Sequence, residues 1–299
     1  MEVMLSSPRG FCAGVVRAVE VVEICLERFG APVYVKHQIV HNPHVVHDLE
    51  LKGAITVETI EEIPPGSTVV FSAHGSPPED FEKAELRGLR VIDAVCPLVT
   101  RVHNEAKKYQ KEGKKVLLVG HRGHQEVRGT MGQVEMTLID DTDSFELPKF
   151  PDDTEVAVLT QTTLSVGDTA AAIKAIQERF PGAVVRNDIC YATTNRQEAV
   201  TKMATHVDMV LVIGAQNSSN CNRLREVAAA HGVPAYLING PEEIDSSWLE
   251  GKDKVGITSG ASTPEILVEQ VIEALAAEKV TMLDGADEDV SFTLPKELR

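Results

Sequence analysis

The stretch that decides the fold is VVRNDICYATTNRQEAVTKM, residues 184–203, in which an apolar run leads through a cysteine into a segment with helical periodicity. The same order occurs in VMLSSPRGFCAGVVRAVEVV (3–22) and in VIDAVCPLVTRVHNEAKKY (91–109). The junction cysteines of the three stretches are Cys12, Cys96 and Cys190. Open α/β sheets bind ligands at the carboxyl ends of their strands, so the pattern predicts one shared metal centre with a thiolate from each stretch.

Strand-like and helix-like segments alternate outward from these stretches along most of the chain. The expected strands lie at 3–6, 33–39, 68–72, 90–95, 116–119, 136–139, 156–160, 183–187, 209–213, 234–238 and 254–258. Such alternation is typical of α/β folds with mostly parallel sheets covered by helices. The cysteines follow one another after 84 and 94 residues, which suits three similar small units. The predicted division is 14–96, 97–190, 191–281 together with an N-terminal strand in 1–13, and a C-terminal extended arm at 282–299.

The composition indicates a soluble globular protein and excludes several classes. Of 299 residues, 43% are hydrophobic and 25% are charged. Only 4% are aromatic, which argues against stacking platforms for single-stranded nucleic acid. The formal net charge of −16 repels phosphate backbones, so nucleic acid is not expected as a partner. No apolar run approaches the roughly 18 residues of a membrane-spanning helix, so no membrane partner is expected either.

The cysteine content and the first residues predict a cytoplasmic protein. MEVMLSSPRG has no basic segment followed by an apolar one, so no secretory signal is expected. Five cysteines are an odd number and are widely spread, which argues against a disulfide framework. Reduced thiols in a cytoplasm are the better interpretation.

Small polar residues and histidines follow nearly every expected strand. The clusters are VHNPH (40–44), SAHGS (72–76), GHRGHQE (120–126), TQTT (160–163), QNSSN (216–220) and SGAST (259–263). Helix starts offer unpaired N–H groups and a partial positive charge, which suit phosphate, and a protonated histidine adds charge. Any single cluster is explained by helix capping alone. Six clusters at the same end of the strands favour a bound anionic ligand.

The cysteines leave two kinds of metal centre open. Zinc would take a fourth ligand such as histidine, whereas a [4Fe–4S] cluster held by three cysteines would keep one iron open to substrate. The absence of any CxxC pair favours the cluster, because structural zinc ligands usually come in close pairs. Cys25 is predicted to be a buried helix residue, and Cys221 lies outside the repeat.

These motifs together resemble the LytB/IspH family of 4-hydroxy-3-methylbut-2-enyl diphosphate reductases. They are PRGFCAGV (8–15), VHN (40–42), SAHG (72–75), DAVCPLVT (93–100), GHRGHQEVRGTMGQ (120–133), TQTTLSV (160–166), DICYATTNRQEAV (188–200), NSSNCNRL (217–224) and TSGASTPE (258–265). The resemblance covers the whole chain. It implies a trefoil of three α/β units around a central iron–sulfur cluster, and reductive removal of a hydroxyl in the last step of the non-mevalonate isoprenoid pathway.

The resemblance also implies a role for each matching residue. Cys12, Cys96 and Cys190 match the three ligands of one [4Fe–4S] cluster. Glu126 matches the proton donor, and Thr162 is placed to orient the hydroxyl or water. The substrate-binding positions implied are His41, His74, His124, Thr162, Thr163, Ser218, Ser219, Asn220 and Ser262. The implied partner besides the allylic diphosphate is a low-potential electron donor, a ferredoxin or flavodoxin.

Two other functions stay open from the residues. One is a zinc-dependent hydrolase of a small diphosphate, with Glu126 as general base. The other is a non-catalytic iron–sulfur sensor, which would leave the polar clusters and Glu126 without a purpose. Metal analysis separates the zinc hydrolase from an iron–sulfur protein.

Overall fold

The strands form three parallel sheets in a computed structural model that describes residues 1–140 and 145–299, and this confirms the α/β fold class. One sheet has the order β3–β2–β4–β5: Ala54–Val57, Val33–Lys36, Thr68–Phe71 and Arg90–Asp93. A second has the order β7–β6–β8–β9: Met136–Asp140, Lys115–Gly120, Val156–Thr160 and Val184–Val185. The third has the order β11–β10–β12–β1–β13: Ala235–Ile238, Met209–Ile213, Lys254–Ser259, Glu2–Leu5 and Lys279–Met282.

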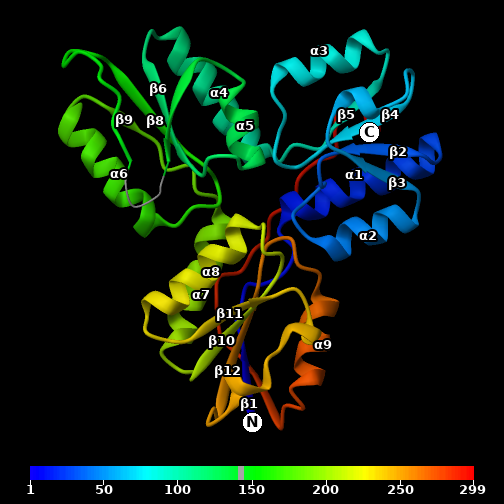
Figure 1. The fold of residues 1–299 in the computed structure, drawn as a ribbon, viewed down its shortest axis with the longest axis vertical. Coiled ribbons are helices and arrows are strands. Elements are labelled where there is room, and N and C mark those ends of the chain that lie inside the picture. The colour runs from blue at the N-terminus through cyan, green and yellow to red at the C-terminus, as the bar shows by residue number, and fades with distance from the viewer. Residues whose placement is uncertain (141–144) are drawn as a thin grey trace. The chain divides into compact units, whose positions relative to one another are not determined.

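Helices follow most of these strands, as the alternation predicts (Figure 1). The α-helices are α1 Ala13–Phe29, α2 Pro43–Leu51, α3 Pro78–Leu86, α4 Pro97–Lys111, α5 Gln125–Met131, α6 Val166–Arg179, α7 Tyr191–Ala204, α8 Ser219–Ala230 and α9 Glu265–Ala274. Short 3₁₀ turns lie at Ile60–Glu62, Pro241–Glu243, Ser246–Leu249 and Lys296–Leu298. In the part of the chain that the structure describes, none of these helices is both long and apolar enough to cross a membrane.

Contacts divide the chain into two compact units. The first comprises 1–15, 41–45 and 191–291 and holds the five-stranded sheet. The second comprises 16–40, 46–190 and 292–299 and holds both four-stranded sheets. The finer division into three α/β units with the boundaries given above stays a prediction.

Both faces of the five-stranded sheet in the first unit are buried. Leu211 and Ile257 pack with Val268 of α9, whereas Val210 and Val212 pack on the opposite face with Leu224 of α8. Figure 1 shows α9 on one side of this sheet and α7 and α8 on the other. Because alternate residues of a strand point to opposite faces, a strand covered on both sides reads as a continuous apolar run. This is why β10 is MVLVI.

The sheet around β6 and β8 in the second unit is covered in the same way. Leu117 and Val158 pack with Ile176 of α6, and Leu118 and Leu159 pack on the other face with Val102 of α4. At the other four-stranded sheet, Val69 and Phe71 pack against Ala84 of α3. These layers fix the carboxyl ends of β4, β6 and β8, where the polar clusters begin.

Two strands, β3 and β13, are not among those expected from the sequence. Both are edge strands of four residues. In β13 three of the four residues are exposed, and in β3 the run AITV is interrupted by a threonine. Neither strand has the buried apolar run that marks the central strands, so periodicity alone does not reveal them.

Candidate functional site

Glu126 and Thr162 form a buried pair in the second unit. Glu126 is the second residue of α5, after β6, and Thr162 follows the end of β8. The Thr162 N–H donates to Oε1 of Glu126 at 2.6 Å, and the Thr162 hydroxyl donates to Oε2 at 2.9 Å. Both side chains are buried, at 4% and 5% exposure. The two carboxyl oxygens are therefore held in one orientation by two donors from a single residue.

Burial raises the pKa of Glu126 to about 7, and the nearby charge of Asp188 acts in the same direction. The two hydrogen bonds from Thr162 lower the pKa but do not cancel the effect of burial. A carboxyl group with a pKa near neutrality can carry a proton at physiological pH and release it to a reacting group. Glu126 is thus suited to general-acid chemistry, which agrees with the role that the resemblance implies.

The backbone after β8 connects this pair to a cysteine. The Cys190 N–H donates to the Thr162 carbonyl at 3.0 Å, so Cys190 is anchored to the residue that holds Glu126. Gln161 lies directly before Thr162. Its side chain accepts the His121 N–H at 3.0 Å and donates to the Thr163 hydroxyl at 2.9 Å. These contacts align the residues that follow β6, β8 and β9.

His74 and His124 lie close together in the second unit. Their rings meet edge to face with centroids 6.0 Å apart. A close backbone approach makes this possible, because a Cβ on Gly129 would lie only 2.5 Å from the Gly75 carbonyl oxygen. Gly75 itself has φ +83, a conformation that glycine adopts without strain. The helix after β6 and the loop after β4 can therefore approach closely only with glycine at these places.

His124 caps the start of α5. Its Nδ1 accepts the N–H of Glu126 at 3.2 Å, so this nitrogen acts as an acceptor in that contact. An imidazole that accepts through one nitrogen can donate through the other. Nε2–H of His124 is therefore suited to donate a hydrogen bond to an anion.

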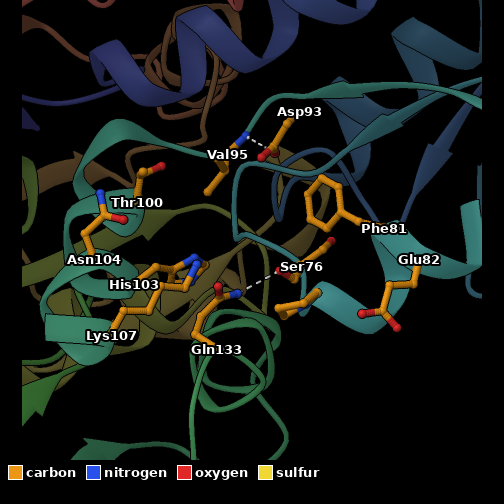
Figure 2. A pocket seen from close by; sticks show the side chains of 11 residues that line it. Ser76, Phe81, Glu82, Asp93, Val95, Thr100, His103, Asn104, Lys107 and Gln133 are labelled. Carbon is orange, nitrogen blue, oxygen red and sulfur yellow. Dashed lines mark hydrogen bonds between the residues drawn. The ribbon is translucent and has the colours of Figure 1, made fainter. Parts of the chain in front are cut away.

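Cys96 lies in a turn whose backbone is fully hydrogen-bonded. The N–H groups of Ala94 and Cys96 donate to the carbonyls of Phe71 and Ala73, each at 3.0 Å. The Val95 N–H donates to Oδ1 of Asp93 at 3.0 Å (Figure 2). Cys96 directly precedes α4, whose first residue is Pro97. The turn presents the thiol at a helix N-terminus.

In the first unit, the predicted residues lie around the ends of β12 and β10. The Cys12 N–H donates to the Ala261 carbonyl at 3.1 Å, and the Ser262 hydroxyl donates to the His41 carbonyl at 2.9 Å. Nδ1 of His41 lies 3.5 Å from the side-chain nitrogen of Asn217. The loop that contains Ala261 and Ser262 therefore contacts both Cys12 and His41.

Ser218, Ser219 and Asn220 begin α8 in the same unit. The Ser218 hydroxyl oxygen accepts the Cys221 N–H at 3.4 Å, which is ordinary helix capping. Asn220 is 4% exposed, and neither its Oδ1 nor its Nδ2 has a hydrogen-bond partner in the structure. Buried polar groups are almost always hydrogen-bonded. An orphaned amide at this helix start therefore indicates a place for a polar ligand.

The five cysteines fall into two classes. Cys12, Cys96 and Cys190 are partly exposed, and each directly precedes a helix, α1, α4 or α7. A helix N-terminus stabilises a thiolate, which is the form that binds metal. Cys25 and Cys221 are buried, and burial raises the pKa of each thiol to about 11. The first three are therefore the candidate metal ligands among the five cysteines.

Within the described residues, no three histidine, cysteine or carboxylate side chains meet in a way that would hold a single metal ion. Three cysteine thiolates would be a soft donor set, which is the kind that iron–sulfur clusters prefer.

A cavity of about 410 Å³ in the second unit lies beside the Cys96 turn (Figure 2). Val95 and Thr100 line it on either side of Cys96 in sequence, and α4 contributes His103 and Lys107. Burial lowers the pKa of His103 to about 4, helped by the charge of Lys107. Among the described residues, the lining includes none of those predicted for the site.

Two residues that support the site were missed by the sequence analysis. Asp188 accepts the Thr160 N–H at 3.3 Å, and its own N–H donates to the Thr160 hydroxyl at the same distance. The Tyr191 hydroxyl accepts the Ala13 N–H at 3.4 Å, next to Cys12. Both lie near Cys190 in the motif DICY, and their position beside a predicted ligand was the available signal.

The chain has clear similarity to known proteins. The LytB protein family matches residues 3–276. A 4-hydroxy-3-methylbut-2-enyl diphosphate reductase of Azoarcus sp. (strain BH72) is 52% identical over 305 aligned residues, which cover 100% of this chain and 98% of that protein.

Two solved structures resemble the fold. One is the E-1-hydroxy-2-methyl-but-2-enyl-4-diphosphate reductase from Plasmodium falciparum, with a TM-score of 0.94, 37% identity, and coverage of 100% of this chain and 96% of that chain. The other is an (E)-4-hydroxy-3-methyl-but-2-enyl diphosphate reductase, described as the terminal enzyme of the non-mevalonate pathway. Its TM-score is 0.65, its identity is 35%, and the match covers 92% of this chain and 99% of that chain.

Proposed function

The chain belongs to the LytB protein family of 4-hydroxy-3-methylbut-2-enyl diphosphate reductases, and from this premise we propose how its residues carry out the reaction. The proposed reaction converts (E)-4-hydroxy-3-methylbut-2-enyl diphosphate to isopentenyl and dimethylallyl diphosphates, the products that the resemblance implies. Relatives of the chain are described as such reductases, and one as the terminal enzyme of the non-mevalonate pathway. Two electrons and two protons replace the hydroxyl by hydrogen, and the oxygen leaves as water. The observation that carries the proposed mechanism is the buried Glu126–Thr162 pair.

The proposed cofactor is one [4Fe–4S] cluster, held by Cys12, Cys96 and Cys190. The support is their shared position before a helix, their partial exposure and the soft character of three thiolates. When bound, such a cluster supplies low-potential electrons and a Lewis-acidic iron. A ferredoxin or flavodoxin is the proposed source of the electrons.

The proposed substrate site uses donors at helix starts. His41, His74 and His124 together with Thr163, Ser218, Ser219, Asn220 and Ser262 would bind the diphosphate. Imidazole N–H, hydroxyl and amide groups can donate hydrogen bonds to phosphate oxygens, and helix N-termini add partial positive charge. The orphaned amide of Asn220 would gain its missing partners from the ligand. These donors offset the repulsion expected from a chain with a net charge of −16.

Glu126 is the proposed proton donor to the departing oxygen. Cleavage of a C–O bond near neutral pH needs protonation of the oxygen, because hydroxide is a poor leaving group. Glu126 carries a proton up to a pH of about 7 and is held in one orientation by Thr162. Thr162, which touches the carboxyl group through its hydroxyl, is the proposed group that orients the substrate hydroxyl or the water formed from it.

An anaerobic product assay tests the function. The full chain, prepared without oxygen, is incubated with the hydroxylated diphosphate and a strong one-electron donor. Isopentenyl and dimethylallyl diphosphates are expected, with the diphosphate group retained. Release of inorganic phosphate by a zinc-containing, iron-free protein would instead support the hydrolase alternative and overturn the reductase.

The pH dependence of turnover follows from the proton on Glu126. Since the pKa of Glu126 is raised to about 7, the protonated fraction falls as the pH rises through that value. We expect kcat to fall by about tenfold per pH unit above the pKa, when measured with saturating donor and substrate. Thr162→Val removes the side-chain hydrogen bond that lowers this pKa, so the falling limb should move to higher pH. If the falling limb stays at the same pH in this variant, deprotonation of Glu126 is not its cause.

A further inference from the structure

Arg17 on α1 is a buried arginine that touches the Cys96 turn. Its side chain is only 8% exposed. Nη1 donates to the carbonyl of Ala94 at 3.1 Å and to that of Val95 at 2.9 Å. These are the two residues before Cys96. The N–H of Ala94 already donates to the carbonyl of Phe71, the last residue of β4, and the N–H of Val95 donates to Oδ1 of Asp93. Arg17 therefore satisfies the remaining carbonyl groups of the turn.

The C-terminal segment 292–299, which belongs to the same unit as Arg17, completes this arrangement. Nε of Arg17 donates to the Thr293 carbonyl at 2.8 Å, and Leu298 is buried with 1% exposure. Arg299 donates from Nε to the Leu294 carbonyl at 2.8 Å, which holds the end of the segment in place. Arg17 thus joins α1, the Cys96 turn and the end of the chain.

The charge of Arg17 acts on its surroundings at close range. Its Nη1 contacts the carbonyl groups of Ala94 and Val95, the two residues before Cys96 in the chain. Burial lowers the pKa of Arg17, and the charge of the Asp93 carboxylate opposes this effect. The guanidinium keeps its positive charge under all ordinary conditions. A charge removed from water acts more strongly on a neighbour than one at the surface.

We propose that Arg17, held by the C-terminal segment 292–299, is a positioning residue for Cys96 and makes reduction of the bound cluster easier. This proposal rests on the proposed function, because it needs a cluster bound through Cys96. Adding an electron increases the negative charge of a thiolate-bound cluster, and a fixed cation beside one thiolate stabilises the reduced form. Net charge and hydrogen bonding near the sulfurs are known determinants of such potentials.

The test is an anaerobic redox titration of the cluster in the full chain, followed by electron paramagnetic resonance. In Arg17→Gln, the ratio of reduced to oxidised cluster at a fixed potential should fall about tenfold, which corresponds to about 59 mV for one electron. Arg17→Lys keeps the charge, so its ratio should stay within about threefold of the wild type. The matched control is Arg87→Gln. Arg87 also donates to two main-chain carbonyls, those of Glu61 and Ile63, but precedes the amino end of β5, opposite to the Cys96 turn.

A second variant, Asp93→Asn, is expected to shift the ratio of reduced to oxidised cluster in the opposite direction. This test remains valid even if Arg17→Gln does not fold. Asparagine can still accept the Val95 N–H but removes a negative charge, so the ratio of reduced to oxidised cluster should rise at pH 8. Opposite shifts in the two variants cannot come from general loosening of the turn. Ratios within twofold of the wild type in both variants, or a shift in Asp93→Asn alone or in the wrong direction, would overturn the proposal. A wild-type chain without any cluster would instead overturn the proposed function.

Discussion

Replacing Glu126 by glutamine is expected to lower turnover by about 100-fold or more, since general-acid catalysis typically contributes 10²–10⁴-fold. Glutamine has nearly the same shape, accepts the Thr162 N–H through its carbonyl oxygen and pairs with the Thr162 hydroxyl through its amide. It has no acidic proton to give to the departing oxygen. The measurement is kcat under anaerobic conditions with saturating donor, per chain that carries cluster.

Cluster content and substrate binding should be unchanged in Glu126→Gln, and folding should not suffer. The pKa of Glu126 is raised from 4.5 to about 7 in the fold, so between these values the native state binds more protons than the unfolded state. Stability then falls as the pH rises through this window, and an uncharged glutamine escapes that loss. We therefore expect the thermal midpoint at pH 8 to be equal or higher.

Glu105→Gln is the matched control for Glu126→Gln. Glu105 lies on α4 in the same unit, and its carboxylate is partly buried and 3.6 Å from Arg186. Its loss should leave kcat within about twofold, because it is not placed to give a proton to the substrate. Turnover of Glu126→Gln equal to that of the wild type would remove the proposed role of Glu126.

The sequence predicts the central architecture because buried parallel strands are written as continuous apolar runs. β10 (MVLVI) and β8 (VAVLT) are such runs, and both lie where the sequence analysis expects them. The edge strands β3 and β13 bury too little to leave this signal. Residues 141–144 lie outside the described part of the chain, after the expected strand 136–139, which the structure confirms as β7.

The sequence names the candidate reacting groups, but it does not show the contacts that set their properties. Glu126 and Thr162 belong to motifs that can be read along the chain. Their pairing joins residues 36 positions apart, and the pKa of about 7 comes from burial, which no motif states. Arg17 is a charged residue inside an otherwise apolar helix face, and its contacts to Ala94 and Thr293 bridge distant parts of the chain. Tertiary contacts of this kind leave no local pattern.

Replacing any one of Cys12, Cys96 and Cys190 by serine should remove both the cluster and the activity. A serine hydroxyl is a harder and much less acidic ligand than a thiol, so it holds iron poorly in place of a thiolate. Loss of one of the three proposed ligands should lower the iron bound per chain by more than about tenfold. This is a larger effect than that of changing a residue that only supports a ligand. The expected loss of activity is of the same size, since no electrons reach the substrate without the cluster.

Cys25→Ser and Cys221→Ala are the controls. Both thiols are buried, and burial raises the pKa of each to about 11, so neither offers a thiolate. Cys221 also fills a tight space, because a Cβ on Gly214 or Gly260 would lie 2.3 or 2.2 Å from its sulfur. Alanine is therefore the safer change there. These two variants should keep the cluster, with a moderate loss of stability at most.

The central claim is that one thiolate from each of the three repeated stretches holds a single iron–sulfur cluster. Its most direct test is the iron and acid-labile sulfide bound per chain, measured on proteins prepared without oxygen. The wild type and the Cys25 and Cys221 variants should contain about four of each per chain, the stoichiometry of a [4Fe–4S] cluster. The Cys12, Cys96 and Cys190 variants should contain almost none. A full complement of iron and sulfide in any of these three, or zinc without sulfide in the wild type, would contradict the account.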